Sequence, residues 1–403
     1  MLFKLALRNV LRQRVRTGMT LGAVVFGVAV LILAGGFIQD IFVQLGEAII
    51  HSQTGHIQVF KRDFLEKGTR APERYLIDEP EALMSALEHQ PGVEAVMGRL
   101  FFAGVMNNGR RDLPIIGEGV EPDKEARLGS FIQITAGRQL AKDDQDGILL
   151  GQGVAHNLGL APGDRATLLV NTGDGAMNSL DFQVIGVFQS FSKDFDARAV
   201  RIPLGAAQEL LATPGINQIV MALHKTEDTD AAYQATTAQV GAALEVRHWR
   251  NLSDFYDKAV QLYDRQFGFL RLIVLMMVLL SVTNSVNMSV FERQGEFGTM
   301  QAMGNPRRQV ARLILAESLI IGAAGAILGM ALGLLGAALL SAIGIPMPPP
   351  PNANVGYIAT IRPNVWIVVS SGMVGLASTL GAAVIPASRI SRIPVVDALR
   401  QNI

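Results

Sequence analysis

The chain has 403 residues, of which 49% are hydrophobic and 17% are charged, and its formal net charge at pH 7 is zero. Soluble domains usually carry about 25% charged residues, so the mean hydropathy of +0.31 indicates that part of the chain lies in a membrane. Zero net charge argues against a nucleic-acid partner, because such proteins normally present a basic face. The lack of cysteine excludes disulfides, thiolate zinc sites and cysteine nucleophiles.

Four runs without charge are long enough to cross about 30 Å of hydrocarbon, which takes roughly 20 helical residues. They occupy residues 17–39, 272–291, 318–345 and 363–388. The stretch between the first two runs, residues 46–251, is rich in charge and turn residues and is long enough for one or two small domains. We therefore expect a membrane protein with four transmembrane α-helices and a large extracytoplasmic α+β domain inserted between helices 1 and 2.

Basic residues set the expected orientation of these helices. Residues 1–16 hold five of them and no acid, and positive charge beside a first span keeps that end in the cytoplasm. Alternation with apolar residues predicts an amphipathic elbow helix over 1–16, although the charges would also serve to set topology alone. The apolar run is too long for the core of a cleaved signal peptide.

The remaining loops favour cytoplasmic N- and C-termini. The loop at 292–317 carries four arginines near its membrane ends, and the tail at 389–403 carries three. The proline-rich loop at 346–362 has only Arg362, so it is expected on the opposite side of the membrane. Residues 46–251 would share that side, which is the periplasm in a Gram-negative cell.

Helical periodicity continues beyond two of the apolar runs. Residues 17–45 extend the first span, and no proline interrupts residues 252–291, a helix that would reach roughly 60 Å. We expect two stalks that carry the outer domain, and the alternative is two ordinary helices that pack beneath it. Spacings of three and four residues predict a heptad seam on the second stalk, formed by Tyr256, Val260, Tyr263, Phe267 and Leu270.

Strand patterns and turn signals alternate through residues 46–251, as expected of a mixed α+β domain. The turn at 172–178 predicts a β-hairpin. Strands are predicted at 56–60, 93–97, 117–120, 166–170, 182–188 and 218–223, and helices at 80–90, 151–158, 204–212 and 229–244. The six histidines have no metal-ligand spacing, and no catalytic motif is present, so we predict no catalytic residue and no metal site.

The chain has no Gly-Lys dipeptide and therefore no nucleotide-binding P-loop. Energy for any work would come from a partner or an ion gradient, and the spans lack the intramembrane charge that ion coupling usually needs. We expect no cofactor on this chain and expect ATP and Mg²⁺ on a partner ATPase. The charged segment that begins FERQGEFGTMQAMG at Phe291 lies between two spans, where a partner would dock.

Several segments together resemble a known family. FERQGEFGTMQAMGNPRRQVARLILAESLIIGAAGAILGMALG at 291–333 and PASRISRIPVVDALR at 386–400 resemble the core of the FtsX-like permease domain. LALRNVLRQRVRTGMTLGAVVFGV at 5–28 resembles the opening of MacB-type and LolC/LolE-type ABC permeases. TGHIQVF at 54–60 and GILLGQGVAHNLGLAPGDRATLLV at 147–170 are most similar to the lipoprotein-releasing branch.

The resemblance implies a type VII ABC transporter permease that works by mechanotransmission. Such permeases pair with a second permease copy or paralogue and with two copies of a separate ABC ATPase. The family's coupling helix falls on the start of the loop at 292–317, although the same residues would also cap and pack beneath spans two and three. The resemblance places ATPase contacts at Glu292, Glu296, Phe297, Met300, Gln301 and Met303.

In lipoprotein-releasing relatives, acyl chains sit between spans one and two. Lipid-facing packing would explain the same apolar residues here. The resemblance places the substrate cavity at Phe26, Val30, Phe37 and Ile41 on span one, and at Phe269, Ile273, Met276, Met277 and Leu280 on span two.

The expected function is extraction of lipoproteins from the outer leaflet of the inner membrane, with membrane lipid and a periplasmic lipoprotein carrier as further partners. The turn at 171–178 is short for the hairpin that recruits the carrier in LolC-type permeases, which puts direct recruitment in question. The alternatives are MacB-like efflux of drugs or peptides and an FtsX-like signalling scaffold that activates a periplasmic hydrolase.

Overall fold

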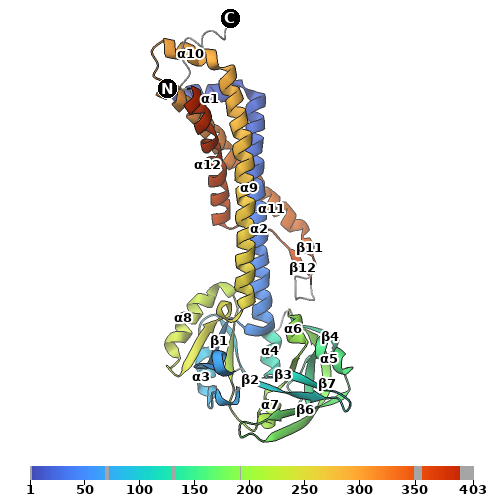
Figure 1. Cartoon of the computed structure of the whole chain (residues 1–403). Coiled ribbons are helices and arrows are strands. Elements are labelled where there is room, and N and C mark those ends of the chain that lie inside the picture. Colours follow the sequence, from blue (N-terminus) through green and yellow to red (C-terminus); the bar gives the residue numbers. More distant parts are fainter. Residues whose placement is uncertain (1, 69–71, 129–131, 191, 349–355, 391–403) are drawn as a thin grey trace. The chain divides into compact units, whose positions relative to one another are not determined.

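A computed structural model of the chain describes residues 2–68, 72–128, 132–190, 192–348 and 356–390. Most of the tail expected at 389–403 and the centre of the proline-rich loop lie outside these residues. The chain divides into two compact units. We call Met1–Val43, Ala259–Pro346 and Ile358–Ile403 the helical unit, and Gln44–Lys258 with Met347–Tyr357 the sheet unit. Figure 1 shows the elements of both along the chain.

Long helices build the helical unit. In the described part of the chain, four are long and apolar enough to cross a membrane, which confirms the expected number of spans. Two of them, α2 and α9, continue into the sheet unit as unbroken helices. The helices are α1 (Leu2–Arg12), α2 (Arg14–Ile49), α9 (Asp254–Glu292), α10 (Gln294–Ala302), α11 (Arg307–Ile343) and α12 (Val365–Ile390).

The predicted seam on α9 faces its neighbours. Tyr263 lies edge-on against Phe42 of α2, with ring centroids 6.1 Å apart. Further along, Val274, Val278 and Val282 join a buried cluster with α2 side chains. Figure 1 shows α2 and α9 side by side through this region. Leu270 of the predicted seam packs against the same cluster, so seam residues contribute to the packed face of α9, while the buried valines beyond them are spaced four residues apart.

Glycines let α11 approach α2 closely. An added Cβ at Gly325 would lie 2.7 Å from Val24, and one at Gly329 would lie 2.7 Å from Val28. These glycines are four residues apart and share one helix face, the pattern that brings membrane helices into close contact. Gly333 continues the row against Ile32 of α2. The valine and isoleucine side chains of α2 therefore fill the space that a side chain on these positions of α11 would need.

In the described residues of the sheet unit, ten strands form one sheet in the order β10-β1-β9-β2-β3-β8-β5-β7-β4, with β6 paired to β2 and β7. The expected α+β fold is confirmed. The strands are β1 (Ile57–Lys61), β2 (Val93–Asn107), β3 (Asp112–Val120), β4 (Gln133–Gly137), β5 (Gly147–Gly151), β6 (Arg165–Asn171), β7 (Met177–Gln189), β8 (Ala199–Pro203), β9 (Gln218–Leu223) and β10 (Leu244–His248). A separate pair joins β11 (Ile345–Met347) to β12 (Tyr357–Ala359).

Short helices cover the sheet, and two apolar clusters form its cores. One cluster lies around Phe102 and Phe182, the other around Ile57 and Ile219. The helices are α3 (Pro80–Glu88), α4 (Pro122–Leu128), α5 (Gln152–Leu158), α6 (Lys193–Asp196), α7 (Leu204–Leu211) and α8 (Thr229–Gln239).

The predicted hairpin and one predicted helix had different outcomes. β6 and β7 pair antiparallel up to Asn171 and Met177, which confirms the hairpin. The helix predicted over 229–244 is too long, because α8 ends at Gln239 and β10 begins at Leu244. Gly241 lies between them, and glycine is a weak helix former.

Candidate functional site

The turn between α9 and α11 holds the segment that the sequence singled out for docking. α9 ends at Glu292, and Arg293 leaves the helical conformation with φ −105° and ψ 13° before α10 begins. Glu296 lies in the first turn of α10, where its charge complements the helix dipole. Gly304, with φ +94°, ends the segment, and its N–H donates to the Gln301 carbonyl. The sequence therefore builds a short helix across the ends of two long ones.

A buried apolar cluster fixes α10 beneath the long helices. Phe297 of α10 is 1% exposed and packs in a cluster with Ala6 of α1, Leu313 and Ile314 of α11, and Ala387 of α12. Met300 is partly buried against the same cluster. Residues from α1, α10, α11 and α12 thus meet around one phenylalanine ring.

An ion network lies beside this cluster. Arg293 donates from Nη1 to both carboxylate oxygens of Glu317, at 3.0 Å each, and from Nε to Glu296 at 3.0 Å. The Arg293 side chain is 10% exposed and that of Glu317 is 13% exposed. Asn9 of α1 donates to Glu317 at 2.6 Å. Buried charges need this degree of pairing, because desolvation otherwise outweighs their attraction.

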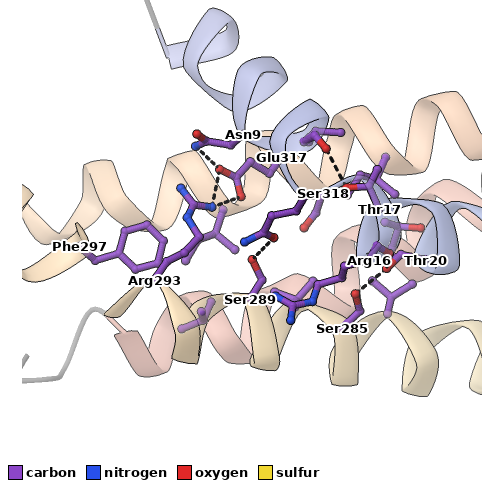
Figure 2. Close-up of a pocket in the computed structure, with 18 residues that line it drawn as sticks. Asn9, Arg16, Thr17, Thr20, Ser285, Ser289, Arg293, Phe297, Glu317 and Ser318 are labelled. Carbon is purple, nitrogen blue, oxygen red and sulfur yellow. Dashed lines mark hydrogen bonds and ion pairs between the residues drawn. The ribbon is translucent and has the colours of Figure 1, made fainter. Parts of the chain in front are cut away.

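The guanidinium of Arg293 also lies over a ring. Its Cζ is 4.9 Å from the centroid of Phe297, a cation–π contact that links the ion network to the apolar cluster. Burial alone would lower the pKa of Arg293, but Glu317 and Glu296 raise it, so the side chain stays charged. Figure 2 shows Asn9 and Arg293 converging on the carboxylate of Glu317.

Two exposed ion pairs surround the buried one. Arg16 of α2 lies 2.5 Å from Glu292, and Arg12 of α1 lies 3.4 Å from Glu296. Both glutamates are about half exposed, so solvent screens the attraction within each pair. These pairs orient the first two helices against the turn and add little to stability.

A small polar cavity lies behind the network. Its volume is about 40 Å³, enough for a few water molecules and too small for a lipid or a nucleotide. The Thr20 and Ser285 hydroxyls are 2.5 Å apart across it, and Ser289 donates to Gln13 at 3.1 Å. Figure 2 shows the Thr20 hydroxyl of α2 meeting the Ser285 hydroxyl of α9. The cavity is therefore a polar packing layer between helices.

The structure separates the predicted ATPase contacts into exposed and buried residues. Glu296 is exposed on α10, Met303 is exposed directly after it, and Glu292 at the end of α9 is also exposed. Gln301 and Met300 are partly exposed. Phe297 has no exposed surface to offer a partner, so its placement supports the packing alternative and not a direct contact. For the other five residues the contact stays a prediction.

Five residues of the ion network and its surrounding pairs were absent from the predicted site: Asn9, Arg12, Arg16, Arg293 and Glu317. One signal could have found the acid of the central pair. Glu317 is the only acid in the 37 residues of α11, and an acid in an apolar membrane helix needs a partner. The basic residues nearest to it in the sequence are Arg307, Arg308 and Arg312 of α11 itself, so the sequence does not single out Arg293 as that partner.

Six of the nine predicted substrate-cavity residues are exposed on the helical unit. Phe269, Ile273 and Leu280 of α9 are 70%, 58% and 62% exposed. Met276 and Met277 of α9 are about half exposed, and Phe26 of α2 is 61% exposed. Val30, Phe37 and Ile41 are partly buried. This surface would meet lipid, a substrate or a second subunit. Within the described residues, no cluster of three or more ligating side chains could hold a metal ion.

Comparison with known proteins identifies the family to which the chain is similar. Residues 17–239 match the model of the MacB-like periplasmic core domain, and residues 268–395 match the FtsX-like permease C-terminal model. The transmembrane protein LolE of the lipoprotein-releasing system of Haemophilus influenzae is 23% identical over 79% of this chain and 80% of its own. LolC of Xylella fastidiosa is 23% identical over 72% and 74%.

A third relative, the uncharacterized ABC transporter permease YvrN of Bacillus subtilis, is 24% identical over 98% of each chain. Permeases of this type are subunits without an ATPase domain, so an ABC ATPase partner is implied. The first of the two family models alone covers more than half of the chain. The chain therefore belongs to the family of ABC transporter permeases that join a MacB-like periplasmic core domain to an FtsX-like permease domain.

Proposed function

We propose that this permease extracts lipoproteins from the outer leaflet of the inner membrane for transfer towards the outer membrane. The observation that carries the proposal is the similarity to LolE, which extends over 79% of this chain and includes both domains. The membrane subunits of the lipoprotein-releasing system in two organisms are among its relatives. In this proposal the termini are cytoplasmic and the sheet unit is periplasmic.

The partner ATPase would dock on the exposed face of α10. Glu296, Met303 and the neighbouring Glu292 offer two carboxylates and a flexible thioether there. The buried pair of Arg293 and Glu317 would then carry any displacement of α10 into α11, because the pair joins the two elements through two hydrogen bonds. The assembly would hold two ATPase copies and a second permease copy or paralogue.

The outward face of α9 would receive the acyl chains. Phe269, Ile273 and Leu280 present a continuous apolar surface, and Met277 supplies a side chain that adapts to irregular shapes. A second permease subunit would close this face from the other side. Acyl chains held between the two subunits would be shielded from water while the protein part of the substrate is released.

Proteoliposomes that contain the permease, its ATPase and a fluorescent triacylated lipoprotein test the proposal. ATP should release the lipoprotein from the membrane, and Glu296→Lys with Met303→Asp should abolish release while the permease still inserts. Glu88→Lys, an exposed charge reversal on α3, is the matched control and should have no effect. Release of a dye or a peptide in place of the lipoprotein would favour efflux. Stimulation of a periplasmic hydrolase without any release would favour the signalling alternative.

A further inference from the structure

α2 continues past its last α-helical turn into a π-helix at Ile50–Thr54. The segment ends at Gly55, whose φ of +63° suits glycine, and the Gly55 N–H closes it on the Ile50 carbonyl at 2.9 Å. A helix end leaves its last carbonyls without partners in the helix and carries a partial negative charge. The carbonyls of Ser52 and Gln53 therefore need donors from elsewhere.

Two buried arginines of the sheet supply these donors. Arg99 of β2 donates from Nη1 to the Gln53 carbonyl, and Arg201 of β8 donates from Nη2 to the Ser52 carbonyl at 3.4 Å. Their side chains are 2% and 4% exposed. All four residues belong to the sheet unit. Positive charge thus meets the negative end of the helix through hydrogen bonds to defined backbone atoms.

Two glutamates balance the arginines. Glu125 of α4 accepts two bonds from Arg99, at 2.5 and 3.0 Å, and Glu118 of β3 accepts one from Arg201 at 2.9 Å. Burial alone would raise the pKa of Glu125, but Arg99 and Arg201 lower it, so the carboxylate stays charged. We call the set of Arg99, Arg201, Glu118 and Glu125 the arginine clamp.

Stability alone does not explain the arginine clamp. A buried ion pair is often no more stabilising than apolar side chains of the same volume, and the sheet unit already has two apolar cores. An apolar contact also tolerates sliding. A hydrogen bond from a guanidinium to one carbonyl keeps its strength only over a narrow range of distance and angle. The arrangement therefore serves to hold the helix end in one position.

We propose that Arg99 and Arg201 are positioning residues that fix the end of α2 to strands β2 and β8, so that movement of the helix is passed to the sheet unit. The proposal rests on the mechanotransmission part of the proposed function. It assigns the point at which force enters the sheet, and it names backbone carbonyls as the atoms that are held. Loss of the clamp should leave the sheet folded and free the helix end.

Hydrogen exchange of the full chain in lipid nanodiscs tests the contact itself. Arg99→Met with Glu125→Met removes one pair without leaving a charge unpaired, and it should speed amide exchange at residues 50–55 by at least about tenfold. Exchange in β1, β2 and β9 should stay slow. Arg138→Met removes an exposed arginine that forms two bonds to Asp144, and this matched control should leave residues 50–55 unchanged. Equal exchange in the clamp variant and the parent would overturn the proposal.

A spectroscopic label on the sheet unit distinguishes failure of the arginine clamp from failure of the proposed function. The chain has no native cysteine, so Ala176→Cys, at the exposed β6–β7 turn, takes a single label. With the ATPase present, ATP should change the mobility of this label in the parent and in Arg138→Met, and the change should be lost in the clamp variant, which still hydrolyses ATP. No response in the parent would reject mechanotransmission. An equal response in the parent and the clamp variant would reject the clamp alone.

Discussion

Arg293 and Glu317 are 24 positions apart in the sequence, yet one guanidinium nitrogen of Arg293 lies 3.0 Å from both oxygens of the Glu317 carboxylate. The pair joins the residue after α9 to the interior of α11. Because Asn9 also donates to Glu317, the carboxylate gathers α1, α9 and α11 at one point. Three of the predictions below concern how such contacts hold the helical unit together.

Glu317→Gln should destabilise the chain strongly, because it leaves the buried Arg293 without its main counter-charge. Breaking a buried pair in this way typically costs about 3–5 kcal/mol. Thermal unfolding in detergent should show a clear fall in the melting temperature. Glu296→Gln removes a half-exposed partner of the same arginine and should cost at most about 1 kcal/mol. Equal melting temperatures for the two variants would contradict the central role of Glu317.

Gly329→Ala tests the close contact of α11 with α2. The added methyl group would lie 2.7 Å from Val28 Cβ and 3.0 Å from the Val25 carbonyl oxygen, so a helix must move. Such overpacking costs about 1–3 kcal/mol. Gly381→Ala in α12 is the matched control, because nothing lies within 4 Å of the added group. In detergent, Gly329→Ala should have a lower melting temperature than Gly381→Ala. Melting temperatures equal to the parent's for both variants would show that the contact of α11 with α2 at Gly329 does not contribute to stability.

Asp40→Ala should loosen the chain around β12. Asp40 is fully buried, accepts from the Thr360 N–H at 2.8 Å and from its hydroxyl at 2.7 Å, and pairs with Arg362 at 2.9 Å. Removing the carboxylate leaves these donors unsatisfied. Exchange of the Thr360 amide should rise by about tenfold or more. Asp40→Asn retains an acceptor and should show a smaller change, and protection of Thr360 in both variants would show that Asp40 does not hold it.

Stability of the sheet unit should fall as the pH is lowered from about 6.5. His56 is fully buried, and its Nδ1 accepts the Leu223 N–H at 3.1 Å, so the proton is on Nε2, which lies 3.1 Å from the Thr226 hydroxyl. Burial, together with the charges of His51 and His248, lowers the pKa of His56 from 6.5 to about 4. The unfolded chain takes up this proton near pH 6.5, whereas the folded chain takes it up only near pH 4. The stabilisation is therefore complete above pH 6.5 and decreases below it, by about 3 kcal/mol in full.

The control for this pH effect is His56→Asn, which keeps a donor and an acceptor but does not titrate. Melting of the full chain at pH 7.5, 6 and 5 should show a shallower dependence for the variant than for the parent. Some dependence should remain, because burial also lowers the pKa of His248. The same slope in both proteins would show that His56 does not set it.

Labelling of single introduced cysteines tests the orientation in the membrane. Ala176→Cys should react with a membrane-impermeant maleimide in spheroplasts, whereas Met303→Cys should react only after the membrane is opened. Both positions are exposed, so accessibility within the protein does not limit either reaction. If both cysteines react from the same side, the proposed topology and the transmission of force across the membrane are both wrong.

The spans and the seam of α9 could be predicted from the sequence because each depends on local composition or on a short period. The strand β8 could not. Its sequence, Ala-Val-Arg-Ile-Pro, places an arginine in its centre, which suggests an exposed strand or a loop. Arg201 is buried because Glu118 and the end of α2 surround it, and these partners are 83 and 149 positions away in the sequence.

Within the site, the burial of Phe297 likewise could not be predicted from the sequence. An aromatic side chain in a charged loop between two spans suggested a docking contact, and the family resemblance agreed with this. The structure instead covers the ring with residues of α1, α11 and α12. Glu296 on α10 and Met303 directly after it are exposed, and their contact with the ATPase stays a prediction. The sequence pattern indicates where a helix forms, but not which side of it other helices cover.

The length of α2 has a consequence for related proteins. The helix presents Val24 and Val28 to the glycines of α11 near one end, and its carbonyls at Ser52 and Gln53 are bound at the other. Each added residue rotates one end relative to the other by about 100°. An insertion of seven residues changes this rotation by only about 20°, whereas an insertion of two residues nearly reverses the face. Natural variation in the length of this helix should therefore occur in steps of about seven residues.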